Sequence, residues 1–154
     1  DDKKPSLTDE QRKERATRGE LAVALYLQAG APEVKLPETS PWPDVKTDDP
    51  NYAAYIWVRE KGISYGWSDG KFHADAGISN ATVAAFTYRA AGSPAVKGDS
   101  PYADVKPGAP FYREILWSTQ QYVINPDFGS FNATDLVNRG QLEQMLFNFQ
   151  NRAK

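Results

Sequence analysis

The chain of 154 residues contains no cysteine and a single histidine. The lack of cysteine excludes disulfide bonds, thiol nucleophiles and thiolate metal sites, and one histidine leaves too few ligands for a structural zinc site. The 18 basic and 20 acidic side chains nearly balance, so the basic surface typical of duplex nucleic-acid binders is missing. The longest apolar run, residues 21–27, is far shorter than a membrane-spanning helix. We therefore expect no metal, cofactor, nucleic-acid partner or membrane insertion.

What the sequence does contain is an internal repeat. Three pairs of positions show it: Asp44 and Asp104, Trp57 and Trp117, and Phe72 and Phe131. The first two pairs are 60 residues apart and the third is 59 apart, so the second copy has lost one residue in a loop. Similarity at a fixed period indicates repeated supersecondary units that pack against one another.

Helical spacing of apolar residues, with capping residues at the ends, predicts the secondary structure. The predicted helices cover residues 17–29, 51–61, 79–91, 111–121 and 138–152, with a further short helix within 8–16. Thr17 with Glu20, and Asn138 with Gln141, are spaced as capping boxes. No segment alternates as a strand does. The chain is therefore predicted to be all-α, with long ordered loops.

The repeats also divide the chain. An N-terminal arm or extra helix (1–16) precedes a partial first repeat and linker (17–39), a second repeat (40–99) and a third repeat (100–154). We expect residues 17–154 to form one compact domain, because repeated units of this kind bury their apolar faces only against one another.

The order of the motifs resembles the S-layer homology (SLH) repeat of bacterial cell-wall-associated proteins. The most specific segments are Gly-Trp-Ser-Asp-Gly-Lys-Phe at 66–72 and Thr-Arg-Gly-Glu at 17–20. The resemblance implies a pseudo-threefold, spindle-like helical domain of an exported Gram-positive surface protein. It further implies non-catalytic binding of secondary cell-wall polysaccharide, often through pyruvylated sugars, in grooves between neighbouring repeats. The arginine of the Thr-Arg motif is the ligand residue that the family implies.

The sequence departs from the family pattern in three places. The first repeat lacks its front half, since residues 3–16 contain neither an aromatic-x-Asp-Val motif nor a Gly-Trp loop. Asn80 stands where the second repeat should have arginine, and Pro126 stands for the usual glycine in the third. We expect at most two arginine-based grooves.

Arg18 and Arg139 are the principal candidate ligand residues, because a guanidinium binds a carboxylate through two parallel hydrogen bonds. The alternative is an ordinary surface ion pair, which contributes little. Trp67 lies in a turn and either covers the core or lines a groove, and we expect it to line a groove. Asp69, in the same loop, and Asn80 complete the candidate set. Changing either arginine to alanine is expected to weaken wall binding without unfolding the domain.

Other prominent residues are interpreted structurally. Trp57 and Trp117 lie on apolar helix faces and are expected in the core. Asp44 and Asp104 are expected to accept hydrogen bonds from backbone amides of a nearby turn. His73, which is not repeated, is interpreted as incidental.

Two other functions stay open at this stage. The missing half repeat leaves room for a second copy or an upstream segment to complete it, which would suit a surface assembly module with degenerate sugar binding. A glycosidase with paired carboxylates is the third alternative, but no spacing in the sequence favours it, so we expect no enzyme.

Overall fold

The computed structural model describes residues 7–125 and 129–153, in which there are six helices and no strand. The helices are α1 (Asp9–Lys13), α2 (Arg18–Gln28), α3 (Tyr52–Glu60), α4 (Asn80–Ala90), α5 (Tyr112–Gln120) and α6 (Arg139–Gln150). The all-α prediction is confirmed, and the five longer helices end within two residues of their predicted limits. Pro126 lies outside the described residues.

Side-chain caps explain where the helices start. The predicted capping boxes at Thr17 and Asn138 are both formed, and Thr8 with Gln11 forms a third at α1. Helix α4 has a simpler cap, in which the Ser79 side chain accepts from the amide of Thr82. Each of these side chains satisfies an amide that the helix itself leaves without a partner.

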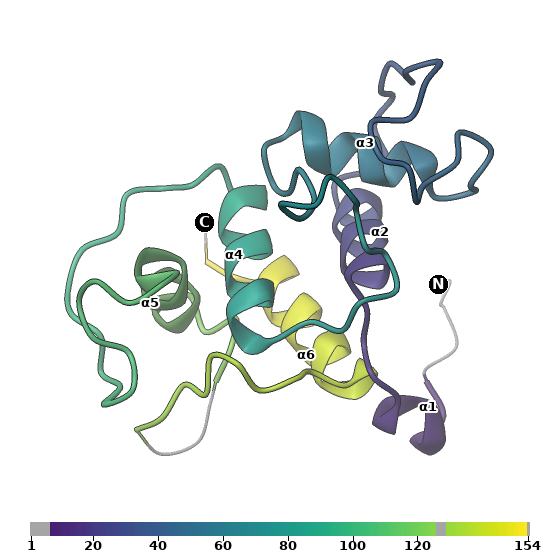
Figure 1. Cartoon of the computed structure of the whole chain (residues 1–154). Helices are drawn as coiled ribbons and strands as arrows, with labels where there is room; N and C mark the ends of the chain where they lie inside the picture. The colour runs from purple at the N-terminus through teal and green to yellow at the C-terminus, as the bar shows by residue number, and fades with distance from the viewer. Residues whose placement is uncertain (1–6, 126–128, 154) are drawn as a thin grey trace.

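The helices are arranged as a central set with outer partners (Figure 1). Helices α2, α4 and α6 lie in the middle of the molecule, and α3 packs on α2 while α5 packs on α4. Among the outer helices, the short α1 packs on α6, and α5 contacts α6 through Trp117 and Phe149, whose ring centroids lie 6.2 Å apart. Within residues 7–125 and 129–153, α6 has no packed partner that corresponds to α3 on α2 or α5 on α4.

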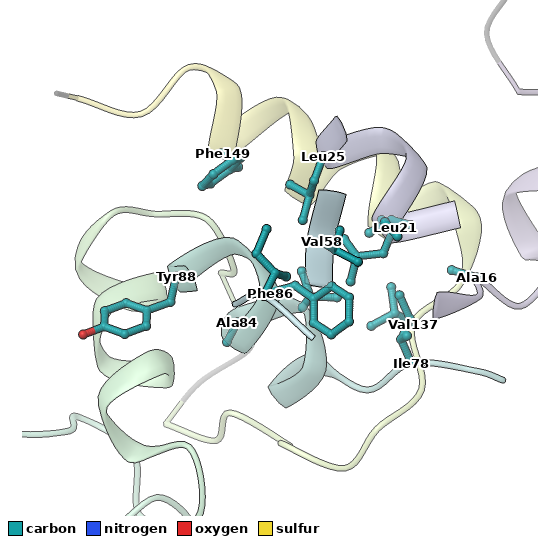
Figure 2. Packing of buried hydrophobic residues seen from close by; sticks show 14 of the residues in the cluster. Ala16, Leu21, Leu25, Val58, Ile78, Ala84, Phe86, Tyr88, Val137 and Phe149 are labelled. Atoms are coloured by element: carbon teal, nitrogen blue, oxygen red, sulfur yellow. The ribbon is translucent and has the colours of Figure 1, made fainter. Parts of the chain in front are cut away.

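Three isolated antiparallel bridges join the starts of the central helices. They link Thr17 to Gly77, Ser79 to Leu136, and Asn138 to Arg15. Each bridge connects the N-cap of one helix to the residue two positions before the N-cap of the next, so the three bridges form a closed cycle. Ala16, Ile78 and Val137 are buried at this junction, and their side chains lie close together (Figure 2). The first and last parts of the chain are thus joined directly.

The outer face of α6 differs from those of α2 and α4. Tyr26 packs on Trp57 and Tyr88 packs on Trp117, each with ring centroids 5.7 Å apart. Phe147, at the corresponding position of α6, has 60% of its surface exposed. One turn earlier, α6 has the exposed Glu143 where α2 has the buried Ala22. A charged side chain at this position favours exposure of this face of α6 to solvent over its burial under a further helix.

Candidate binding site

Arg18, Asn80 and Arg139 occupy corresponding first positions of α2, α4 and α6, but their surroundings differ. We call the region around Arg18, where the start of α2, loop 63–73 and α4 meet, groove A by analogy with the cavities beside Asn80 and Arg139. Groove B is the cavity around Asn80 that is lined by residues of 123–125, 132–136 and α6. Groove C lies beside Arg139, between α2 and α6.

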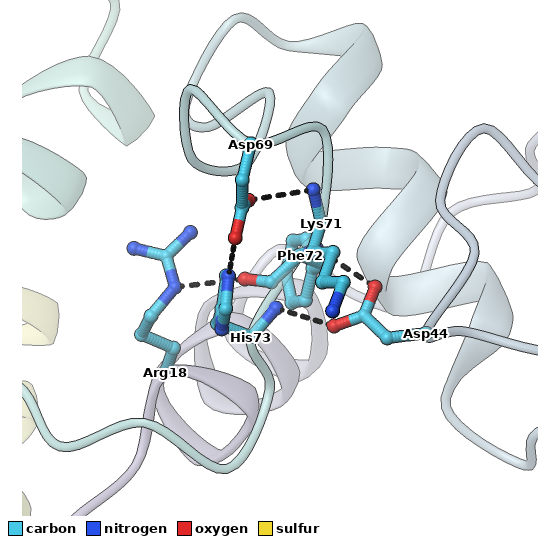
Figure 3. Close-up of polar contacts among 6 residues, drawn as sticks. All are labelled: Arg18, Asp44, Asp69, Lys71, Phe72 and His73. Atoms are coloured by element: carbon cyan, nitrogen blue, oxygen red, sulfur yellow. Dashed lines mark hydrogen bonds and ion pairs between the residues drawn. The ribbon is translucent and has the colours of Figure 1, made fainter.

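In groove A the Arg18 guanidinium is held inside the molecule. Only 7% of Arg18 is exposed. Its Nε donates to the carbonyl of Phe72 at 3.0 Å, as Figure 3 shows, and Nη2 donates to the hydroxyl of Ser64 at 2.9 Å. The guanidinium carbon lies 5.4 Å from the centroids of the Phe72 and Phe86 rings and 6.0 Å from that of Trp67.

The charge of Arg18 is only partly compensated. Within the described part of the chain, no carboxylate lies within ion-pair distance of Arg18. Burial lowers the pKa of Arg18, and the field of the more distant Asp44 raises it, with burial the stronger effect. A buried cation with hydrogen bonds only to neutral oxygens favours an anionic ligand that comes within reach.

Asp44 fixes the carbonyl that Arg18 contacts. Its carboxylate accepts from the amides of Phe72 at 2.9 Å and His73 at 2.8 Å (Figure 3), which confirms its predicted role. Burial raises the pKa of Asp44, but these amide hydrogen bonds together outweigh it and leave the pKa below its usual value. Asp104 makes the same two bonds in the third repeat, at 3.0 and 2.9 Å. The Asp-Val motif therefore shapes the loops beside grooves A and B.

Trp67 presents an aromatic surface at the mouth of groove A. It is 48% exposed and stacks on the ring of His73, with centroids 3.8 Å apart and planes 25° apart. His73 Nε2 lies 2.7 Å from the carboxylate of Asp69, which also accepts from the amide of Lys71 at 2.9 Å. The amide of Lys71 and the side chain of His73 lower the pKa of Asp69.

The structure thus brings Arg18, Trp67 and Asp69 together and adds His73, which sequence reasoning missed. In the sequence, the signal for the contact between Asp69 and His73 is their four-residue spacing. Asp69 acts here through His73, which supports the indole of Trp67.

Groove B keeps the loop contact of groove A without its charge. The side-chain amide of Asn80 donates to the carbonyls of Phe131 at 3.2 Å and Asn132 at 3.0 Å. The Phe131 carbonyl corresponds to that of Phe72, so asparagine replaces arginine in the same structural contact. The groove has a volume of about 370 Å³.

Groove C is larger, about 790 Å³, because the first repeat has no front-half loop to fill it. Ala24 also stands there at the position that the buried Phe86 takes on α4. Arg139 Nη1 lies 2.8 Å from Glu14, and its Nε lies 3.0 Å from Glu20. Both donating edges of Arg139 therefore meet carboxylates of the chain itself.

In residues 7–125 and 129–153, no three potential metal-ligating side chains cluster, and no helix has the length and apolarity needed to cross a membrane. A scan against protein-family models and a search of curated proteins each found no match.

Proposed function

We propose that this protein is a non-catalytic module of the bacterial cell surface that anchors an exported protein to secondary cell-wall polysaccharide. In this proposal its three units form a pseudo-threefold, SLH-like arrangement. The closed cycle of three bridges at the helix starts supports that arrangement. So do the side-chain caps that begin α2, α4 and α6.

Groove A is the proposed site for an acidic sugar, such as one that carries a pyruvyl ketal or a uronate. The observation that carries the proposal is the buried Arg18, whose partners are a hydroxyl and a carbonyl. Charge-assisted hydrogen bonds from a guanidinium to a carboxylate are among the stronger protein contacts, and they strengthen away from water. Beside it, the exposed face of Trp67 offers a surface on which a sugar ring packs.

Arg139 supports the choice of a carboxylate ligand. It starts its helix as Arg18 does, and its guanidinium is bound by the carboxylates of Glu14 and Glu20. An arginine at this helix position therefore has the reach and orientation for carboxylates. Since Arg139 is already neutralised and Asn80 carries no charge, we propose one principal acidic site rather than three equal ones.

Trp67 gives the cleanest test, because its exposed side chain contributes little to the core. Purified Trp67→Ala protein should co-sediment with wall sacculi much less than wild type, by about tenfold in affinity if the stacking contact is worth roughly 1.5 kcal/mol. Tyr122→Ala, which removes an exposed aromatic from the third repeat, is the matched control. Stripping the secondary polymer from the sacculi should abolish binding of wild type and of the Tyr122→Ala control.

Arg18 needs a conservative variant, because its burial makes alanine disruptive. Arg18→Ala removes two hydrogen bonds and leaves a cavity, at a cost of about 2–3 kcal/mol in unfolding free energy. Arg18→Lys keeps the charge but loses the fork of donors. It should weaken sedimentation with complete sacculi while the thermal midpoint changes little. If Arg18→Lys, Trp67→Ala and wild type sediment equally, groove A does not bind the wall polymer.

Assembly with another protein is the second candidate function. The exposed Leu27 beside groove C and the exposed Phe147 on α6 favour it. The polar Glu143 on the same face of α6 disfavours a docked helix. Light scattering separates the two candidates, because an assembly module that self-associates would show a mass that rises with concentration.

A further inference from the structure

Groove B differs from groove A in the charge of the side chains around it. Six of its lining residues carry a carboxamide: Asn80, Asn125, Asn132, Gln141, Gln144 and Asn148. Among the described lining residues, Asp135 is the one that carries a charge, and, apart from the six carboxamides, the others are apolar. A carboxylate ligand would have no cation to meet in this lining and would face the charge of Asp135.

Two substitutions between corresponding positions account for the difference. Arg89 on α4 donates to the carbonyl of Ile63 at 3.0 Å, and Asn148 on α6 donates to the equivalent carbonyl of Val123 at 3.1 Å. Asn80 likewise replaces Arg18 while keeping a bond to the loop carbonyl. At both positions the structural contact is kept and the positive charge is lost.

The carboxamides are ordered by one another. Gln144 Nε2 donates to Asn148 Oδ1 at 2.9 Å, and Asn148 in turn donates to the Val123 carbonyl. Each carboxamide offers two donors and an acceptor with two lone pairs. Among the described residues, these internal bonds use neither Gln144 Oε1 nor Asn80 Oδ1, and they use one of the two side-chain N–H groups of Asn148.

We infer that groove B is a second sugar-binding site, specific for an uncharged saccharide. A sugar hydroxyl donates and accepts hydrogen bonds at once, so it matches a carboxamide better than a fixed charge. The exposed Leu136 and half-buried Met145 offer an apolar surface to the C–H face of a sugar ring. The volume lies within the usual range of small-molecule sites, about 300–1,000 Å³.

This inference rests on the proposed function in that it assigns the two grooves to different sugars of a wall polymer. Groove A takes an acidic residue and groove B a neutral one. A polymer with both kinds of sugar then binds at two places, and the second contact raises the overall affinity through effective concentration.

The test is a pair of titrations followed by nuclear magnetic resonance. N,N′-diacetylchitobiose serves as the neutral probe and methyl glucuronide as the acidic probe. The neutral probe should shift the side-chain NH₂ signals of Asn80, Gln144 and Asn148 and leave the indole N–H of Trp67 unmoved. The acidic probe should shift the indole N–H signal of Trp67 and leave the three carboxamide signals unmoved. The inference fails if the neutral probe shifts none of the three carboxamide signals.

Charge-restoring variants test the specificity. Asn148→Arg recreates the residue of groove A, and Gln144→Arg places a charge at an exposed position where folding is undisturbed. Each should weaken the neutral probe about tenfold, since hydrogen bonds to the sugar are lost. Gln150→Arg adds the same charge on α6 outside the groove and should change nothing. Equal neutral-probe affinity in Gln144→Arg and Gln150→Arg would overturn the inference.

Arg18→Lys separates this inference from the proposed function. It should weaken the acidic probe and leave the neutral titration as in wild type. If the acidic probe fails to bind while the neutral probe binds in groove B, the proposed acidic site in groove A is wrong and the inference about groove B is supported. If the acidic probe binds in groove A and the neutral probe does not bind in groove B, only the inference about groove B is wrong.

Discussion

Arg18 and Arg139 begin corresponding helices, yet one guanidinium is buried among aromatic rings and the other lies between two glutamates. At the scale of single residues, function here depends on the neighbours that each copy of the repeat supplies. Arg18 also ties loop 63–73 to α2 through the Phe72 carbonyl. The side chain that we propose as the ligand contact of groove A therefore also stabilises the local structure.

Asp44 gives a pH-dependent prediction at this scale. Asp44→Asn cannot accept both amides, so we expect it to lower the unfolding free energy by about 1 kcal/mol at neutral pH. The folded-state pKa of Asp44 is below its usual value. Its stabilising effect is therefore complete above the ordinary pKa of aspartate and is lost as pH falls through the folded-state pKa.

Urea denaturation at neutral pH and at about pH 2.5 checks this, because the difference between wild type and Asp44→Asn should shrink at the acidic pH. Asp48→Asn, at an exposed position with a similar charge, should have little effect at either pH. A difference that stays constant with pH would mean that the charge of Asp44 does not stabilise the loop.

At the scale of elements, α1 covers part of α6 in place of a complete front half. It buries none of its own residues. Two ion pairs connect this segment to α6, Arg12 with Glu143 at 2.6 Å and Glu14 with Arg139 at 2.8 Å. A β-carbon added to Gly140 would meet Arg12, just as one added to Gly19 would meet the loop at Ala74. The same close approach is thus made by α1 in one copy and by a loop in another.

Salt should loosen α1 selectively. Exposed ion pairs are screened as ionic strength rises, whereas the buried contacts of α2 are not. Amide hydrogen exchange of residues 9–13 should speed up several-fold between low salt and about 1 M salt, where the screening length falls to about 3 Å. Exchange in α2 provides the internal reference. Unchanged exchange in α1 would show that its attachment does not depend on these pairs.

Much of the element-level structure was predictable, because caps and apolar spacing are local signals. The capping box of Thr17 is read within four residues of sequence, whereas the amides that Asp104 binds, those of Phe131 and Asn132, lie 27 and 28 residues further along the chain. The surroundings of Arg18 and Arg139 were not predictable in this way. Phe86 and Glu14 reach these arginines across long separations in the chain, and only tertiary packing decides that one site is aromatic and the other acidic.

At the scale of the whole molecule, the cycle of bridges makes the three units depend on one another. Val137 donates its amide to the carbonyl of Ile78 and accepts from the amide of Ala16, so one residue connects all three units. Its side chain is almost fully buried. Loss of packing at this junction should therefore weaken the whole domain rather than one repeat.

Val137→Ala tests this dependence. We expect it to lower the unfolding free energy by about 2 kcal/mol while unfolding stays a single transition. Circular dichroism and tryptophan fluorescence should give the same midpoint, since the tryptophans lie in the second and third repeats. Separate midpoints would show that the repeats unfold independently. The exposed Leu136→Ala is the neighbouring control.

If groove A binds an acidic sugar, as we propose, the bound sugar lies against Trp67 and Arg18, where nuclear magnetic resonance detects it. A methyl glycoside that carries a pyruvyl ketal is titrated into isotopically labelled protein, and the four tryptophan indole N–H signals are followed. We predict that the indole N–H signal of Trp67 and the Nε–H signal of Arg18 shift in a saturable manner. The indole signals of the buried Trp42, Trp57 and Trp117 should not shift. No shift at Trp67, or saturable shifts confined to residues away from groove A, would contradict it.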